Sequence, residues 1–115
     1  MSPPRNAAEI RAEKLARIRA ARMELAQIDA KKLVQMGAPQ ANAEKAAQLV
    51  QQMTTTLLAM EKAVSSQQGD QRFQQQLNKQ YQALQAEAGK ALELHNMMMD
   101  LIRVVSGSGS VSYSD

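Results

Sequence analysis

Hydrophobic positions recur three and four residues apart along most of the chain, which is the period of an α-helix. The clearest run lies in residues 42–66, where small and apolar side chains alternate by three and four without a break, as the a and d positions of a heptad repeat do. We therefore predict a helix over about residues 42–66 that packs this seam against another helix. The seam consists of Ala43, Ala46, Val50, Met53, Leu57, Met60 and Val64.

A second seam with the same alternation follows in residues 71–105. Gly69 and Asp70 stand between the two runs as a turn residue and a plausible N-cap. A continuous helix over residues 71–105 would be roughly 50 Å long at 1.5 Å per residue. Two matching seams joined by a short turn predict an antiparallel helical hairpin. The second seam consists of Leu77, Tyr81, Leu84, Ala88, Ala91, His95, Met98, Ile102 and Val105.

Gly89 lies inside this second predicted helix, beside Ala88 and Ala91. A glycine in mid-helix costs about 1 kcal/mol relative to alanine, so its presence needs a reason. One interpretation is that the small residues let two helix axes approach closely. The other is that Gly89 is exposed and only softens the helix.

The N-terminal third of the chain predicts one more helix, over about residues 6–36. Asn6 followed by Glu9 has the spacing of a capping box, and Gly37 followed by Pro39 is typical of a helix end. Such a helix would be about 45 Å long. Its apolar stripe consists of Ile10, Leu15, Ile18, Leu25, Ile28, Leu33 and Met36, with Ala7 and Ala21 between them.

Composition favours an all-α fold. The chain of 115 residues is 44% hydrophobic but only 3% aromatic, so its core must be built from aliphatic side chains and methionine. We predict an elongated three-helix arrangement in which a long N-terminal helix accompanies an antiparallel hairpin with heptad seams. Residues 1–5 form an N-terminal extension, residues 6–105 a single helical domain, and residues 106–115 a Gly/Ser-rich tail that is flexible or extended.

The stretch from Leu92 to Val105 is more apolar than one seam requires. A helix that is hydrophobic on most sides is normally buried on most sides, either in its own core or against another subunit. Methionines suit the second role because their side chains adapt to irregular surfaces. In the tail, Val111 and Tyr113 alternate with small polar residues and could dock on a neighbour. The candidate protein interface consists of Leu92, Leu94, Met97, Met98, Met99, Leu101, Val104, Val111 and Tyr113.

Basic residues are concentrated in the first predicted helix. Residues 1–32 hold eight basic and four acidic side chains, a surplus of four against a net charge of +3 for the whole chain. Such a helix can contact phosphates, although Arg17 can also pair with Glu13 one turn earlier and leave an ordinary solvated face. Without aromatic residues for base stacking, nucleic-acid binding would be weakly sequence-specific and salt-sensitive. The candidate phosphate contacts are Arg11, Lys14, Arg17, Arg19 and Arg22.

Catalytic chemistry has little to build on in this sequence. The chain has no cysteine, one histidine and no glycine-rich phosphate loop, so we expect no catalytic residue, metal, cofactor or small-molecule substrate. We interpret His95 as a core or interface residue with a satisfied hydrogen bond. No apolar run approaches the roughly 20 residues of a membrane span, and the start lacks the apolar region of a signal peptide. A cytoplasmic protein, or one incorporated in an assembly, fits these features.

The function these patterns favour is that of a non-enzymatic structural subunit that self-associates through its C-terminal helix. Fifteen glutamines supply uncharged polar faces, which can hydrogen-bond across a subunit contact without desolvating ions. In architecture alone, a long helical hairpin with an apolar C-terminal end resembles small subunits of bacterial secretion-system rods or of phage virions. Two alternatives remain: a small basic nucleic-acid-associated protein that binds phosphates through its N-terminal helix, and a helical adaptor or chaperone.

Overall fold

The computed structural model describes residues 6–89 and 92–105, and every regular element in these ranges is helical. The all-α prediction is therefore confirmed. The elements in chain order are α1 (Ala7–Ala26), α2 (Ala30–Gln35), the short 3₁₀ helix η1 (Gln40–Asn42), α3 (Ala43–Ser65), α4 (Gln71–Ala88) and α5 (Leu92–Val105).

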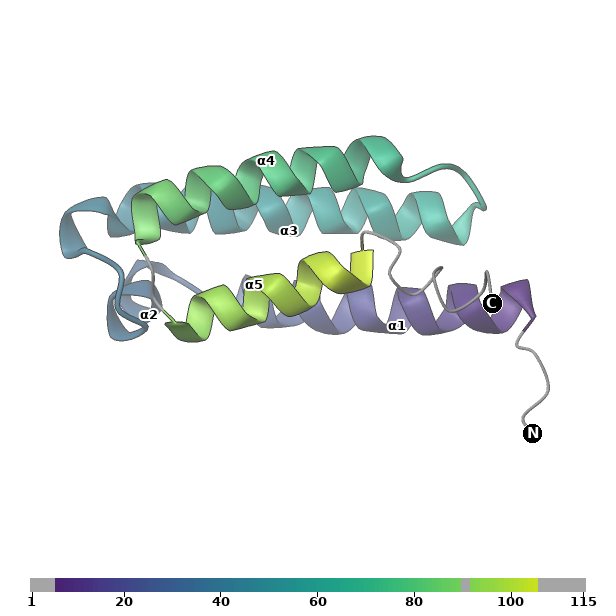
Figure 1. Cartoon of the computed structure of the whole chain (residues 1–115), viewed down its shortest axis with the longest axis horizontal. Helices are drawn as coiled ribbons and strands as arrows, with labels where there is room; N and C mark the ends of the chain where they lie inside the picture. Colours follow the sequence, from purple (N-terminus) through teal and green to yellow (C-terminus); the bar gives the residue numbers. More distant parts are fainter. Residues whose placement is uncertain (1–5, 90–91, 106–115) are drawn as a thin grey trace.

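The four longer helices form an elongated bundle in two layers (Figure 1). The α3–α4 hairpin makes one layer, α1 and α5 make the other, and α2 lies at the end where α1 gives way to α3. Successive long helices run in opposite directions, which is the up-down-up-down order of a helical bundle. The molecule measures 50 × 28 × 20 Å along its principal axes.

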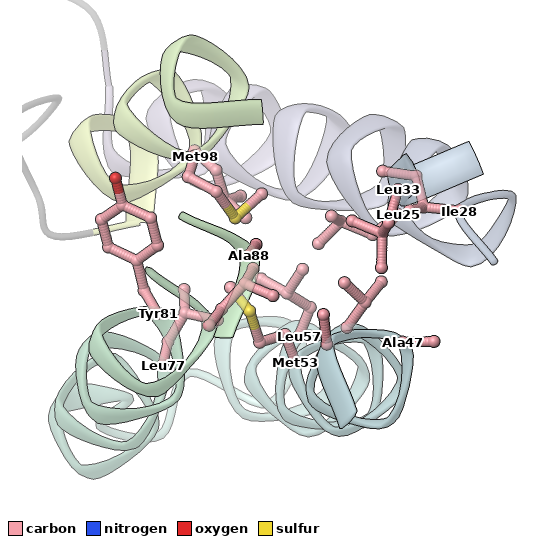
Figure 2. Packing of buried hydrophobic residues seen from close by; sticks show 14 of the residues in the cluster. Leu25, Ile28, Leu33, Ala47, Met53, Leu57, Leu77, Tyr81, Ala88 and Met98 are labelled. Atoms are coloured by element: carbon pink, nitrogen blue, oxygen red, sulfur yellow. The ribbon is translucent and has the colours of Figure 1, made fainter. Parts of the chain in front are cut away.

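The heptad seam of α3 forms the centre of the core, because all seven of its predicted positions are buried. Leu77, Tyr81, Leu84 and Ala88 of α4 are buried against it. The predicted antiparallel hairpin is thus confirmed for α3 and α4. Figure 2 shows these side chains meeting those of α1, α2 and α5 between the two layers. Thr56 is the one buried polar residue of the described part, and its hydroxyl lies 2.9 Å from Oε1 of Gln80 on α4.

The prediction of one continuous helix over residues 6–36 is wrong at residues 27–29. The N–H of Ile28 donates to the carbonyl of Leu25 at 3.0 Å, a tightened last turn that ends α1. Asp29 then adopts extended backbone, and its Oδ1 accepts a hydrogen bond of 2.8 Å from the N–H of Lys32. An aspartate that caps a new helix competes with continuation of the old one. The short α2 consequently places Leu33 in the core from a new direction.

The prediction of one helix over residues 71–105 is also wrong, because the chain turns at Gly89. This residue has φ 71° and ψ −159°, a backbone conformation that is essentially restricted to glycine. A Cβ atom there would meet only the Cδ of Pro39, at an ordinary 3.8 Å. Neither close helix packing nor mere softening therefore explains Gly89. It permits the break that separates α4 from α5 and turns the expected three-helix arrangement into a bundle of four long helices with the short α2 at one end.

Several helix ends use the signals expected from the sequence. The Oδ1 of Asn6 accepts from the N–H of Glu9 at 2.8 Å, as a capping residue should. At the end of α2, the N–H of Ala38 donates to the carbonyl of Leu33 at 2.9 Å, while Gly37 has φ 107°, which is a Schellman motif. The end of α3 has the same motif with Gln67 in place of glycine, at φ 57°.

Candidate interaction site

The candidate interface on α5 is split between the core and the surface. Met98 and Leu101 are buried in the core of their own chain, and Figure 2 shows Met98 pointing into the space between the two layers. Met97 is half-buried, whereas Met99 is 48% exposed. The side chains of Leu92, Leu94 and Val104, together with Val111 and Tyr113, lie outside the described residues. Among the described candidates, only Met99 is a large apolar residue that is exposed.

A groove of about 240 Å³ runs between α1 and α5. Apolar side chains form much of its wall, and Arg17, Glu24 and Asp100 stand at its polar parts. The contact between α1 and α5 is also less extensive than the contact between α3 and α4. The other lining residues are Ala20, Ala21, Leu25, Met97, Met98 and Leu101.

His95 makes the expected hydrogen bond, but it is not a core residue, because it is exposed on α5. Its Nδ1 lies 2.8 Å from the hydroxyl of Tyr81 on α4, and that hydroxyl also accepts from Nε2 of Gln85 at 3.0 Å. Burial raises the pKa of Tyr81 above its ordinary value of 10.0, so its hydroxyl keeps its proton and can still donate while it accepts from Gln85. This polar link attaches α5 to α4.

Ion pairs within the chain engage most of the candidate phosphate contacts. Nζ of Lys14 lies 2.9 Å from Oδ2 of Asp70, and NH2 of Arg17 lies 3.3 Å from Oε1 of Glu13, as its spacing predicted. Arg11 is half-buried on the same helix. The N-terminal basic face is thus partly neutralised by the carboxylates of its own bundle.

Arg19 and Arg22 share a single carboxylate on α3. Nε of Arg19 lies 2.5 Å from Oε1 of Glu61, and Nε of Arg22 lies 3.1 Å from Oε2. The Glu61 side chain is only 12% exposed, so these contacts hold it between the layers. The hydrogen bond from Arg19 is the main reason that the pKa of Glu61 lies below its ordinary value of 4.5. These two arginines therefore act as ties between α1 and α3.

The outer face of α3 carries a feature that the sequence interpretation did not single out. No charged residue occurs between Lys45 and Glu61, although this stretch spans about four turns of a surface helix. Leu58 is 39% exposed within it. The exposed residues lie three and four apart and share one face, which we call the α3 stripe. They are Gln48, Gln51, Gln52, Thr55 and Leu58.

Hydrogen bonds inside α3 make this stripe less polar than its sequence suggests. The hydroxyl of Thr55 donates to the carbonyl of Gln51 at 3.2 Å, and that of Thr54 donates to the carbonyl of Val50 at 2.9 Å. A hydroxyl that bonds back to its own helix uses its proton there and can only accept a hydrogen bond from a partner. Thr55 therefore has no free donor beside Leu58. The only signal in the sequence that could have identified the α3 stripe is the absence of charged residues between Lys45 and Glu61.

Within residues 6–89 and 92–105, no three His, Cys, Asp or Glu side chains are grouped so that they could hold a metal ion. None of the described helices has the length and apolar character needed to cross a membrane.

Comparison with protein-family models, curated proteins and solved structures finds no match to this chain.

Proposed function

We propose that this protein is a non-catalytic assembly subunit whose copies pack side by side through the α3 stripe. The observation that carries the proposal is the absence of charge across four exposed turns of α3. Solvated helix faces are usually rich in Lys and Glu, whereas the centres of protein interfaces are depleted of charged residues.

A second copy of the same chain is the partner that fits this stripe best. Each glutamine amide both donates and accepts hydrogen bonds, so a row of amides is complementary to itself. A two-fold contact requires such self-complementarity, because the same patch meets itself. Leu58 adds apolar area at the C-terminal end of the row.

The stripe is short, and this agrees with a weak two-fold contact between two copies of the chain. Stable interfaces bury about 800 Å² on each partner, more than one row of side chains on four turns provides. Association of single pairs should therefore be weak and concentration-dependent.

Two other functions have less support from the described residues. Phosphate binding through α1 would have to compete with the carboxylates that already hold Lys14, Arg17 and Arg19. An adaptor role through the methionines of α5 would have to release Met98 from the core. Neither gains an observation comparable with the charge-free stripe.

The test is light scattering during size exclusion over a concentration series. A Gln48→Glu/Gln52→Glu variant adds two negative charges to the stripe, and a Gln75→Glu/Gln82→Glu variant adds two to exposed positions of α4 as a matched control. We expect wild type and control to associate alike and the stripe variant to associate at least about tenfold more weakly, because like charges would face each other in the contact. Wild-type protein that is monomeric throughout would refute the proposal, as would equal weakening in both variants.

A further inference from the structure

The connection between α4 and α5 consists of residues 89–91 alone. In the structure described above, which we call the closed chain, α5 packs on its own bundle. The chain can turn back there because Gly89 adopts a conformation that other residues avoid. The space around Gly89 would accept a side chain, since a Cβ atom there meets its nearest neighbour at 3.8 Å. At Gly89, the described residue of this turn, the constraint is thus the backbone conformation and not crowding around it.

The heptad seam continues in register across this turn. Leu84 and Ala88 end the seam in α4, and His95 and Met98 continue it in α5 at the spacing that an uninterrupted helix would give. Residues 71–105 contain no proline, and Gly89 is their only glycine. A straight α4–α5 helix is therefore an accessible conformation. Its cost is that of placing one glycine instead of alanine in a helix interior.

The contacts of α5 can all be supplied by another copy of the chain. Met98 and Leu101 are buried by the core, and His95 meets Tyr81. If α5 entered the same position on a second copy, each of these contacts would be replaced by an identical one. Among the described residues, only Gly89 would need a different conformation.

We propose that two copies of this chain exchange α5, with α4 and α5 joined into one straight helix in each. The segment that occupies the α5 position is the α5 of a second copy, because the sequence of α5 already fits that position. In the closed monomer the tether gives α5 a high effective concentration, whereas in the exchanged dimer the restricted Gly89 conformation is no longer needed. This exchange goes beyond the proposed packing through the α3 stripe and does not depend on it, so either can fail alone.

The test uses two single-cysteine variants, since the natural chain has no cysteine. Ala21 on α1 and Met97 on α5 line the same groove, so Ala21→Cys and Met97→Cys chains become neighbours across molecules only if α5 is exchanged. The two proteins, carrying different tags, are unfolded together, refolded at high concentration and treated with a short thiol cross-linker. We expect a covalent dimer of the two different chains, in clear excess over a control mixture of Gln75→Cys and Met97→Cys proteins.

A yield no higher than the control would overturn the exchange, even if light scattering still showed assembly through the α3 stripe. The same mixture in a Gln48→Glu/Gln52→Glu background should still cross-link, which separates the two contacts. In addition, Gly89→Ala should raise the dimerisation constant about tenfold or more, because alanine disfavours the closed turn and favours the straight helix. Inserting three Gly/Ser residues after Gly89 should lower the constant, because a longer connection relaxes the closed form. Unchanged or opposite effects in these two variants would also overturn the exchange.

Discussion

Lys14 and Asp70 lie 56 positions apart in the sequence, and Nζ of the first is 2.9 Å from Oδ2 of the second. The sequence assigns Asp70 to the start of α4 as an N-cap, and it does occupy that position. Its side chain, however, makes no capping hydrogen bond there and binds α1 instead. Asp70, whose position suggests a local capping role, therefore connects the beginning of α4 to α1 in the other layer.

Replacing Asp70 by asparagine should lower the free energy of unfolding by about 1 kcal/mol, because the half-buried Lys14 ammonium loses its carboxylate. Chemical denaturation measures the change. In a double-mutant cycle with Lys14→Met, we expect a coupling of about 0.5–1 kcal/mol. A coupling of zero would show that the contact contributes nothing. The single variant also frees a cation on the basic face, so a large gain in DNA affinity at low salt would favour the phosphate-binding alternative.

Glu61 should make the stability of the bundle depend on pH in the acid range. Its pKa is lowered in the folded state by Arg19 and Arg22, so its contribution is present above the ordinary value of 4.5 and is lost as the pH falls through the folded value. Glu61→Gln should therefore cost about 1 kcal/mol near neutrality and flatten the loss of stability below pH 4.5. Thermal unfolding, measured from pH 3 to pH 7 in steps of about one pH unit, tests this prediction. Glu24→Gln on the exposed face of α1 serves as the control, and equal pH profiles for both variants would contradict the role of Glu61.

Gln67 should be improved by glycine. It ends α3 at φ 57°, where a side chain costs energy and glycine does not. We expect Gln67→Gly to raise the free energy of unfolding by about 0.5–1 kcal/mol, even though glycine usually destabilises folded chains. Gln68→Gly is the matched control, because Gln68 has no positive φ and should lose stability. If both changes destabilise alike in urea titrations, the left-handed conformation at Gln67 carries no cost.

Adjacent methionines on α5 should respond very differently to truncation. Met98 is 0% exposed, and Met98→Ala should cost about 2–4 kcal/mol by leaving a cavity in the core. Met99 is largely exposed, and Met99→Ala should change stability by less than about 0.5 kcal/mol. Denaturation of monomeric samples at low concentration provides the comparison. Similar losses for the two variants would mean that α5 does not hold the position described.

Local signals predicted much of this fold, because the heptad seams and the capping residues act over a few positions. All of the α3 seam is buried, and α4 begins at Gln71 where the turn signals placed it. The two breaks were harder to predict. Asp29 and Gly89 both sit in sequences whose apolar period runs through them, so periodicity favours a continuous helix where the tertiary structure prefers a turn.

The interaction residues could be predicted only in part, since exposure depends on which helices pack together. The seam period separates Met98, which is buried, from Met99, which is exposed, yet both were candidates for the interface because the pattern could not show which helices cover α5. Likewise, Arg19 and Arg22 read as a basic face until α3 brings Glu61 between them. Their partner lies about forty positions away, a separation that no local pattern records.

The position of α5 has a consequence for how the chain is made. A ribosome synthesises α5 after the other four α-helices, when the α3–α4 hairpin already has the residues of its complete seam. Local contacts of this kind form early, in microseconds to milliseconds, while translation adds only about 5–20 residues each second. The α1 surface that receives Met98 and Leu101 therefore stays uncovered on every nascent chain until α5 has been synthesised. Neighbouring ribosomes on one message hold such unfinished bundles close together, where the helix of one chain can reach the vacant surface of the next.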